Sequence, residues 1–278
     1  MTKLEAEIPG YINGKHIVRR GSEVLANIFT RKSFSEGSRE HLAEAVVLWQ
    51  AGVDAWIASK HESDADVPLV DVAIRNGGFS EFSDSMFILM GNKILDKRFR
   101  GLVARNYPHV AVPQPGSDNG KMRELLPNAK TAIPKLLEER KVAFVFPEGT
   151  RSRDGVLQNA LPSLAHYLTD HAFVLPMAIE GARQAWPVEG LPRLFQEITF
   201  HFAQPILIRD VMTEIDYYEK TTGVKASKSI RNEIIVDTIM RRGIAPLVPI
   251  EQRGPYTNPN VSIPDMLQKN AKRENLVI

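Results

Sequence analysis

The chain has 278 residues, 43% of them hydrophobic and 24% charged, which is ordinary for a globular protein with a sizeable core. Its formal net charge is +2 with histidine neutral, so no global basic field indicates nucleic-acid binding. The absence of cysteine excludes disulfides, thiolate metal sites, iron–sulfur clusters and a cysteine nucleophile, and it fits a reducing compartment.

The N-terminal segment, residues 1–52, is expected to form a small helical region. Ser38 opens a run with a capping residue and polar neighbours that Gly52 stops, and a second helix is expected over about residues 22–34. Met1–Pro9 is charged and poor in apolar residues, unlike a signal peptide, and no apolar stretch approaches the ~18 residues of a membrane span. We therefore expect a cytoplasmic location, with peripheral contact at the inner membrane surface left open.

Residues 53–248 alternate short apolar runs with helical stretches. Several runs are apolar without alternation, as in strands buried on both faces, so the pattern predicts an α/β domain with a mixed, largely parallel sheet flanked by helices. Residues 249–278 read as an extended, proline-rich tail with a short helix near its end. The expected strands are Val53–Ser59, Met86–Leu89, Val110–Val112, Val142–Phe146, Phe173–Ile179 and Ile198–Phe202, and the expected helices are Pro68–Arg75, Ala129–Arg140, Leu161–Thr169 and Lys228–Arg242.

A polar segment, Ser59–Pro68, follows the first expected strand, where α/β sheets present ligand-binding loops. His61 and Asp66 are too far apart for one helix face, but a loop ending at a helix near Val67 could bring them together. A carboxylate bonded to one ring nitrogen leaves the other nitrogen as a general base. The alternative is a capping box at Ser63-x-x-Asp66. A metal site is weaker, because no second histidine lies at ligand spacing among His61, Asp64, Asp66 and Asp71.

A second polar segment, Phe146–Gly155, follows another expected strand. Gly149 permits an unusual turn, Glu148 supplies a carboxylate, and Arg151 and Arg153 carry guanidinium groups that bind phosphate. The alternative is a solvated polar turn.

The two segments together resemble the glycerolipid acyltransferase superfamily. His61-x-x-x-x-Asp66 is followed 87 residues later, from His61 to Glu148, by Phe-Pro-Glu-Gly-Thr-Arg-Ser, in the order typical of that superfamily. The later motif Val174–Ala178 (VLPMA) and the stretch Gly91–Asp96 (GNKILD) look most like the soluble glycerol-3-phosphate acyltransferases. The resemblance covers roughly residues 50 to 210.

The resemblance implies acyl transfer from acyl-CoA or acyl carrier protein to the hydroxyl of glycerol-3-phosphate, with no metal and no other cofactor. His61 would be the general base and Asp66 would orient it and stabilise the imidazolium. Gly149 backbone amides are candidates for stabilising the oxyanion. The implied substrate-binding residues are Glu148, Gly149, Thr150, Arg151, Ser152, Arg153, Lys93 and Arg105.

One stretch departs from the superfamily. The matching middle motif, His109–Pro115, has no Arg or Lys where a basic residue usually stands, and Lys93, Arg105, Lys121 or Arg123 are candidates to supply the charge. Two alternatives therefore stay open: a lysophosphatidate acyltransferase docked on a membrane, and a non-catalytic acyl-binding protein. Candidates for an acyl-chain groove, each with core packing as its alternative, are Phe79, Phe82, Met86, Phe87 and Met90.

Overall fold

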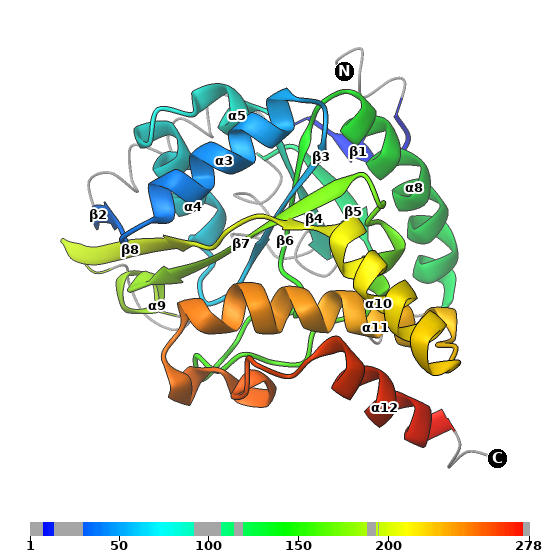
Figure 1. The fold of residues 1–278 in the computed structure, drawn as a ribbon. Coiled ribbons are helices and arrows are strands. Elements are labelled where there is room, and N and C mark those ends of the chain that lie inside the picture. Colours follow the sequence, from blue (N-terminus) through cyan, green and yellow to red (C-terminus); the bar gives the residue numbers. More distant parts are fainter. Residues whose placement is uncertain are drawn as a thin grey trace.

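The structure, a computed structural model, describes residues 8–13, 30–91, 107–113, 119–187, 193 and 195–274. Within these residues the strands form one nine-stranded mixed sheet (Figure 1). The strands are β1 (Tyr11–Ile12), β2 (Thr30–Phe34), β3 (Asp54–Ser59), β4 (Met86–Gly91), β5 (His109–Val112), β6 (Val142–Val145), β7 (Ala172–Glu180), β8 (Gln196–Phe202) and β9 (Ile206–Leu207).

The sheet has a parallel centre. The strand order is β1-β5-β4-β6-β3-β7-β8-β2, with β9 also paired to β7. All neighbours from β5 to β7 are parallel, and so are β2 and β8, whereas β1, β8 and β9 pair antiparallel with β5, β7 and β7. The six expected strands are thus confirmed, with boundaries shifted by a residue or two.

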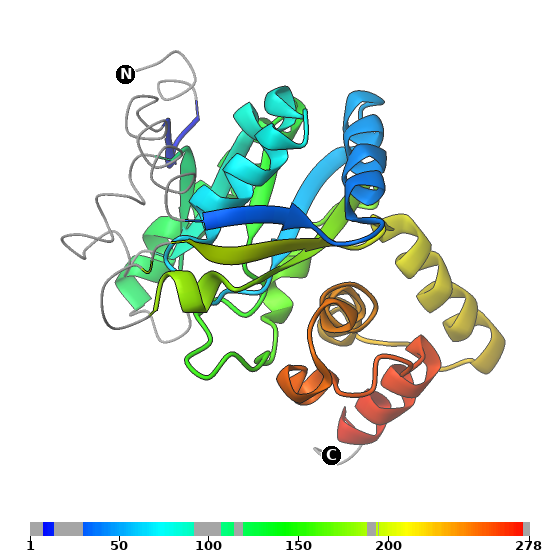
Figure 2. The ribbon, with the colours of Figure 1, turned by 90° about the vertical axis from the view of Figure 1, so that its left-hand side faces the viewer.

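Helices cover both faces of the sheet (Figure 2). The helices are α3 (Ser38–Gln50), α4 (Asp66–Asn76), α5 (Ser80–Asp84), α8 (Asn119–Glu138), α9 (Ala182–Ala185), α10 (Ile208–Thr222), α11 (Lys228–Thr238) and α12 (Ile263–Glu274). Shorter helical turns are η1 (Pro162–His166), the π-helical η2 (Ile239–Ile244), η3 (Ala245–Leu247), η4 (Ile250–Gln252) and η5 (Gly254–Tyr256).

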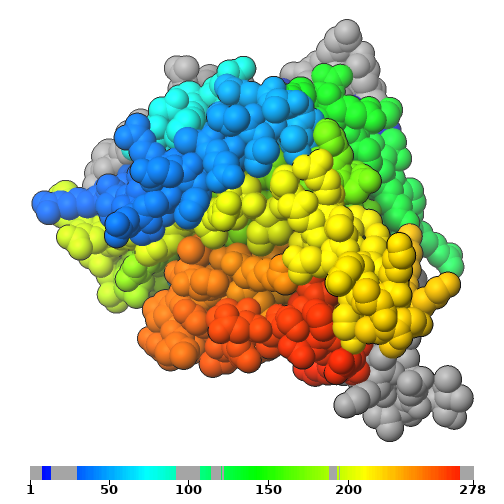
Figure 3. All heavy atoms as spheres, viewed as in Figure 1, coloured from blue at the N-terminus to red at the C-terminus, as the bar shows by residue number. Residues whose placement is uncertain are grey.

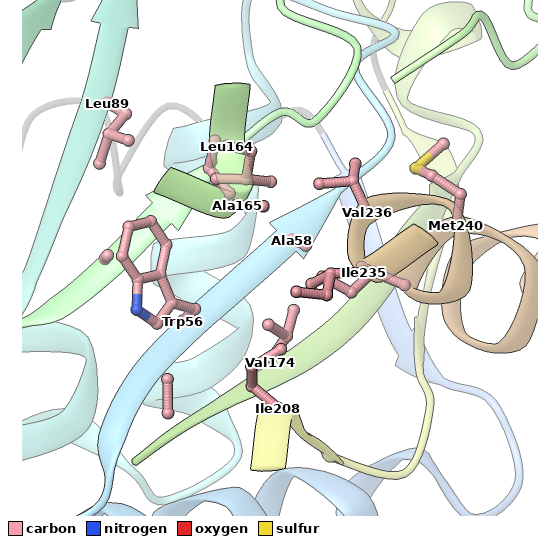
Figure 4. Close-up of a cluster of buried hydrophobic side chains, with 14 of the residues drawn as sticks. Trp56, Ala58, Leu89, Leu164, Ala165, Val174, Ile208, Ile235, Val236 and Met240 are labelled. Atoms are coloured by element: carbon pink, nitrogen blue, oxygen red, sulfur yellow. The ribbon is translucent and has the colours of Figure 1, made fainter. Parts of the chain in front are cut away.

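The core lies in two layers because successive side chains of a strand point to opposite faces. Ala55 and Ile57 of β3 pack with α3, α4 and α5, whereas Trp56 and Ala58 pack with α8, α10 and α11. Figure 4 shows Ala58 facing Ile235 and Val236 of α11 across this second layer. α10, α11 and α12 lie together over the same side of the molecule (Figure 3). The α/β architecture expected from the sequence is confirmed.

The N-terminal region contributes to the sheet. α3 forms as expected, but Thr30–Phe34, which falls in the second expected helix, is a strand parallel to β8. Its side chains alternate across the strand, and Phe34 packs on Phe200 with ring centroids 6.1 Å apart. The helix prediction is wrong for these residues because pairing with β8 overrides local propensity. The remainder of that expected helix, residues 22–29, lies outside the described residues.

The C-terminal segment is more ordered than expected. η4 and η5 replace part of the extended tail, and the expected short helix is confirmed as α12. Ile263, Met266 and Leu267 are buried at helical spacing, which is why this segment folds onto the domain. The domain boundaries at residues 52 and 248 stay predictions.

Across the described part of the chain, no helix combines the length and apolar character needed to cross a bilayer.

Candidate active site

The two polar segments emerge side by side at one edge of the sheet. β3 and β6 are parallel neighbours in which Ala58 pairs with Val145, so the loops that follow both strands start at the same level. The backbone amide of Ser152 donates to the carbonyl of His61 over 2.9 Å. Residues far apart in sequence therefore form one site at the carboxyl ends of the strands.

His61 and Asp66 are in contact. Nδ1 of His61 lies 2.9 Å from Oδ2 of Asp66, whose side chain is 1% exposed. The same oxygen accepts the backbone amides of Glu62 at 2.8 Å and Ser63 at 3.0 Å. α4 begins at Asp66, so the carboxylate both satisfies the loop amides before the helix and orients the imidazole. Only half of the capping box expected from the sequence forms, because the hydroxyl of Ser63 accepts the amide of Ala65 rather than that of Asp66, and α4 has no side-chain cap.

The imidazole is held in plane by an aromatic neighbour. The rings of His61 and Phe146 are stacked, with centroids 3.9 Å apart and an interplanar angle of 16°. Phe146 directly follows β6, so the second segment supports the imidazole of the first. With Nδ1 bonded to Asp66, Nε2 is the nitrogen placed to exchange a proton with a substrate.

Glu148 is buried and bonded to the backbone of both loops. Its carboxylate accepts the amides of His61, at 3.4 Å, and Gln158, at 2.9 Å. Burial raises the pKa of Glu148 to about 7, against the opposing effect of these two hydrogen bonds. Gly149 has φ +65°, and a Cβ there would overlap Leu161. Glu148 and Gly149 therefore shape the turn that presents the following arginine.

The two arginines are placed differently. Nη1 of Arg151 lies 2.9 Å from Oδ1 of Asp64, which belongs to the loop of His61. The Arg151 side chain is 16% exposed, whereas Arg153 is exposed and its carbonyl accepts a hydrogen bond from Arg183. The structure thus brings the side chain of Arg151 to the loop of His61 and leaves Arg153 exposed on its own loop.

Ser152 and Thr150 differ in accessibility. Ser152 is fully buried, and its hydroxyl bonds within the loop, to Asp154 at 3.1 Å and to the carbonyl of Val156 at 2.9 Å. Thr150 is exposed. The hydroxyl of Ser152 therefore stabilises the loop, whereas Thr150 is exposed to solvent.

Part of the expected substrate site lies elsewhere. Lys93 and Arg105 lie outside the described residues, as do the last two residues of the middle motif. Arg123 is exposed on α8. The acyl-groove candidates do not share a face: Phe87 packs in the layer of α8, whereas Phe79, Phe82, Met86 and Met90 belong to the layer of α3 and α4. They do not form a single groove, because β4 directs neighbouring side chains to opposite faces.

The metal alternative gains no support from these contacts. Asp71, the most distant residue of that set, is buried and hydrogen-bonded to Ser83 and Arg75. Among the residues that the structure describes, no cluster of three or more His, Asp or Glu side chains is arranged to hold a metal ion.

Two residues near His61 make contacts that the sequence analysis did not anticipate. Phe146 stood in the motif without a role, and Lys60 directly precedes His61. Lys60 is buried, and its ammonium group contacts Glu62, Gly155 and Gln252. The sequence offered one indication that Lys60 is buried, namely its place directly after a strand expected to be buried. A lysine at such a position is unusual, because lysine is seldom buried unless it is paired.

Comparisons with known proteins identify the family of the chain. The model of the Acyltransferase family matches residues 38–180, just over half of the chain. Over 105 residues the chain is 30% identical to a 1-acyl-sn-glycerol-3-phosphate acyltransferase of Limnanthes douglasii, an alignment that spans only 37% of each chain. The crystal structure of the 1-acyl-sn-glycerophosphate (LPA) acyltransferase from Thermotoga maritima aligns with 76% of this chain and 82% of its own, at TM-score 0.43 and 18% identity. Both motifs fall within the matched range, and the chain belongs to the Acyltransferase family of the glycerolipid acyltransferase superfamily.

Proposed function

We propose that the protein transfers a fatty acyl group from an acyl thioester to the free hydroxyl of 1-acylglycerol-3-phosphate, with His61 as general base. The observation that carries this proposal is the contact of His61 with Asp66 beside the loop of Arg151. A base held in one tautomer next to a guanidinium group suits an alcohol acceptor that also bears a phosphate.

In the proposed reaction, Nε2 of His61 takes the proton of the acceptor hydroxyl as its oxygen attacks the thioester carbonyl. The carbon–sulfur bond then breaks, and the imidazolium returns the proton to the leaving thiolate, which gives an ester and a free thiol. Asp66 stabilises the imidazolium, as the carboxylate of a serine-protease triad does. General-base assistance of this kind is typically worth ~10²–10⁴-fold in rate.

Positioning of the acceptor would supply the rest of the rate acceleration. Arg151 would bind the acceptor phosphate, with Arg153 and Thr150 at the rim of the same loop and Lys93 or Arg105 as further cationic candidates. Glu148, bonded to the amide of His61, would position the base rather than act as one. Backbone amides at Gly149 are proposed donors to the oxyanion.

The choice of acceptor rests on the relative from Limnanthes douglasii, which is named for this activity. Glycerol-3-phosphate is the competing acceptor. Two stretches favour it in the sequence. Val174–Ala178 lies in β7 with its side chains buried, so it offers no group to bind the acceptor. All of Gly91–Asp96 after Gly91 lies outside the described residues. We propose acyl-CoA or acyl carrier protein as donor, and peripheral contact with the membrane that holds a lipid acceptor.

The test is thiol release, which has no background from the protein because it lacks cysteine. Palmitoyl-CoA or palmitoyl-acyl carrier protein is combined with 1-acylglycerol-3-phosphate, with glycerol-3-phosphate or with no acceptor, and binding to anionic vesicles is measured by co-sedimentation. His61→Ala is compared with His171→Ala, which changes an exposed histidine at the opposite, amino end of β7. Release that needs the lysolipid and His61 is expected. Thiol release seen only with glycerol-3-phosphate would identify glycerol-3-phosphate as the acceptor instead. Binding of the acyl donor without thiol release under every condition would favour an acyl-binding protein.

A further inference from the structure

A buried ammonium group lies next to the proposed base. The side chain of Lys60 is 2% exposed, and its Nζ contacts a carboxylate oxygen of Glu62, the carbonyl of Gly155 and Oε1 of Gln252, the last at 2.8 Å. A lysine ammonium has three donors, so these three acceptors satisfy it completely. Burying a charged group is unfavourable unless it is paired and hydrogen-bonded. The three partners therefore explain why the Lys60 ammonium group is stable in a buried position.

The three acceptors come from three separate segments. Glu62 belongs to the loop of His61, Gly155 to the loop of Arg151, and Gln252 to η4 in the C-terminal segment. Gln252 also accepts the amide of Leu157 at 2.7 Å through its backbone carbonyl. Gln252 lies well beyond residues 38–180 matched by the family model, so the site extends into a segment that the family comparison does not reach.

The position of Lys60 couples these segments to the reacting groups. It directly precedes His61, and its own amide donates to the carbonyl of Met177 over 3.4 Å, which fixes it to β7. Gly155 lies on the same loop as Arg151, and the amide of Gly155 bonds to the hydroxyl of Ser152 at 2.9 Å. A shift of this loop away from Lys60 would therefore move Arg151 relative to His61.

We propose that Lys60 is a positioning residue that holds the loop of Arg151 against the loop of His61, and both against the C-terminal segment through Gln252. This inference rests on the proposed acyl transfer. Lys60 touches no reacting atom in it. Its ammonium sets the distance between the base and the phosphate-binding guanidinium.

The first test is the split between the acceptor KM and the donor KM in Lys60→Met, which keeps most of the length of the side chain and removes its charge. The acceptor KM is expected to rise roughly tenfold, because a displaced Arg151 would bind the acceptor phosphate less tightly, while the donor KM stays near the wild-type value. Gln252→Leu should change the acceptor KM in the same direction and less strongly. Lys130→Met, at an exposed position of α8, is the matched control and should leave both constants unchanged.

A second variant separates positioning from charge balance. Lys60→Met alone removes the ammonium group that contacts the buried carboxylate of Glu62, which lowers stability. Lys60→Met with Glu62→Gln removes both charges, so the unfolding midpoint is expected to recover while the acceptor KM stays high. Recovery of both quantities would overturn the inference and reduce Lys60 to a partner for Glu62.

A third measurement does not depend on activity. Amide hydrogen exchange at Ser152, Gly155 and Leu157 is expected to accelerate in Lys60→Met, on the order of tenfold, because local opening of this loop becomes easier. Unchanged protection of these amides together with an unchanged acceptor KM would overturn the inference. If wild-type protein shows no thiol release with any acceptor, the proposed function fails, and the exchange data alone decide whether Lys60 holds the loops together.

Discussion

The imidazole of His61 stacks on Phe146, with centroids 3.9 Å apart, while its Nδ1 bonds to Asp66. The hydrogen bond sets the rotation of the ring within its plane, and the stacking sets the plane. Because Phe146 directly follows β6 and Asp66 begins α4, the orientation of the imidazole depends on two elements at once.

Phe146→Leu should weaken catalysis without unfolding the protein. Leucine keeps apolar bulk but cannot stack, and aromatic pairs contribute ~0.5–1.5 kcal/mol, so kcat is expected to fall by about 2- to 10-fold. Steady-state kinetics measure this. Phe200→Leu, a similar change in the core next to Phe34, should lower stability and leave kcat alone. Equal kcat in wild type and Phe146→Leu would show that stacking has no part in catalysis.

Asp66→Asn should lower kcat by about 10² or more while the loop keeps its shape. One amide oxygen can still accept the amides of Glu62 and Ser63, but the neutral side chain no longer stabilises an imidazolium. Circular dichroism and thermal unfolding establish that the variant is folded, and initial rates of thiol release provide the comparison. A folded Asp66→Asn protein with wild-type kcat would contradict the assigned role of this carboxylate.

Asp64→Asn should lower the acceptor KM, opposite in sign to Arg151→Ala, which should raise it. Asp64 and Arg151 form a partly exposed ion pair, so the carboxylate would compete with the phosphate of the proposed acceptor for the guanidinium. Such pairs contribute ~0.2–1 kcal/mol, which predicts a decrease of roughly 1.5- to 5-fold. Acceptor titrations at constant donor concentration provide the test. A higher KM in Asp64→Asn would mean that Asp64 orients Arg151 instead.

Glu148 should make the folded state less stable as the pH rises. Burial raises the pKa of Glu148 from its ordinary value of 4.5 to about 7. Since the folded state binds this proton more tightly than the unfolded state, the contribution is complete below about pH 4.5 and is lost as the pH rises through about 7. The loss is at most ~3 kcal/mol, at 1.36 kcal/mol per pKa unit.

Urea unfolding of wild type and Glu148→Gln at about pH 5 and about pH 8 isolates this contribution. The fall in unfolding free energy between the two pH values should be smaller in the variant, because glutamine does not titrate. Glu62, whose pKa burial also raises, is present in both proteins and cancels in the difference. An equal fall in the two proteins would remove Glu148 as a source of the pH dependence.

Gly149→Ala should destabilise the protein by ~2–4 kcal/mol, because its left-handed backbone disfavours a Cβ and that Cβ would overlap Leu161. Gly223→Ala is the matched control. Gly223 has φ +75° and nothing within 4 Å of an added Cβ, so only the backbone cost of ~1 kcal/mol applies. Equal losses of unfolding free energy in the two variants would show that contact with Leu161 is unimportant.

Much of the fold could be predicted from the sequence because the central strands are apolar on both faces. Apolar runs such as Val142–Val145 need no tertiary information to be recognised. β2 could not be identified in this way, since its polar sequence becomes a strand only beside β8. α10 was missed for a related reason: along its polar sequence the buried residues are only Ile208, Val211 and Ile215.

The candidate site also has one part that could be predicted from the sequence and another that could not. The loop from His61 to Asp66 could be predicted because spacing and Pro68 together require a turn before a helix. The contact of Lys60 with Gln252 could not be predicted, since the residues are 192 positions apart and nothing local marks either one. Contacts of that kind follow from how α11 and the segments after it fold back over the sheet.

Among the described strands, β1 and β2 lie at the two edges of the sheet, and both come from the first 34 residues. A chain shortened to begin at α3 would uncover β5 on one side and β8 on the other, each with a row of unpaired backbone donors and acceptors. Bare edges of that kind pair with one another between molecules. Such a chain would keep every residue of the proposed site and still self-associate, so its loss of activity would reflect aggregation rather than damaged chemistry.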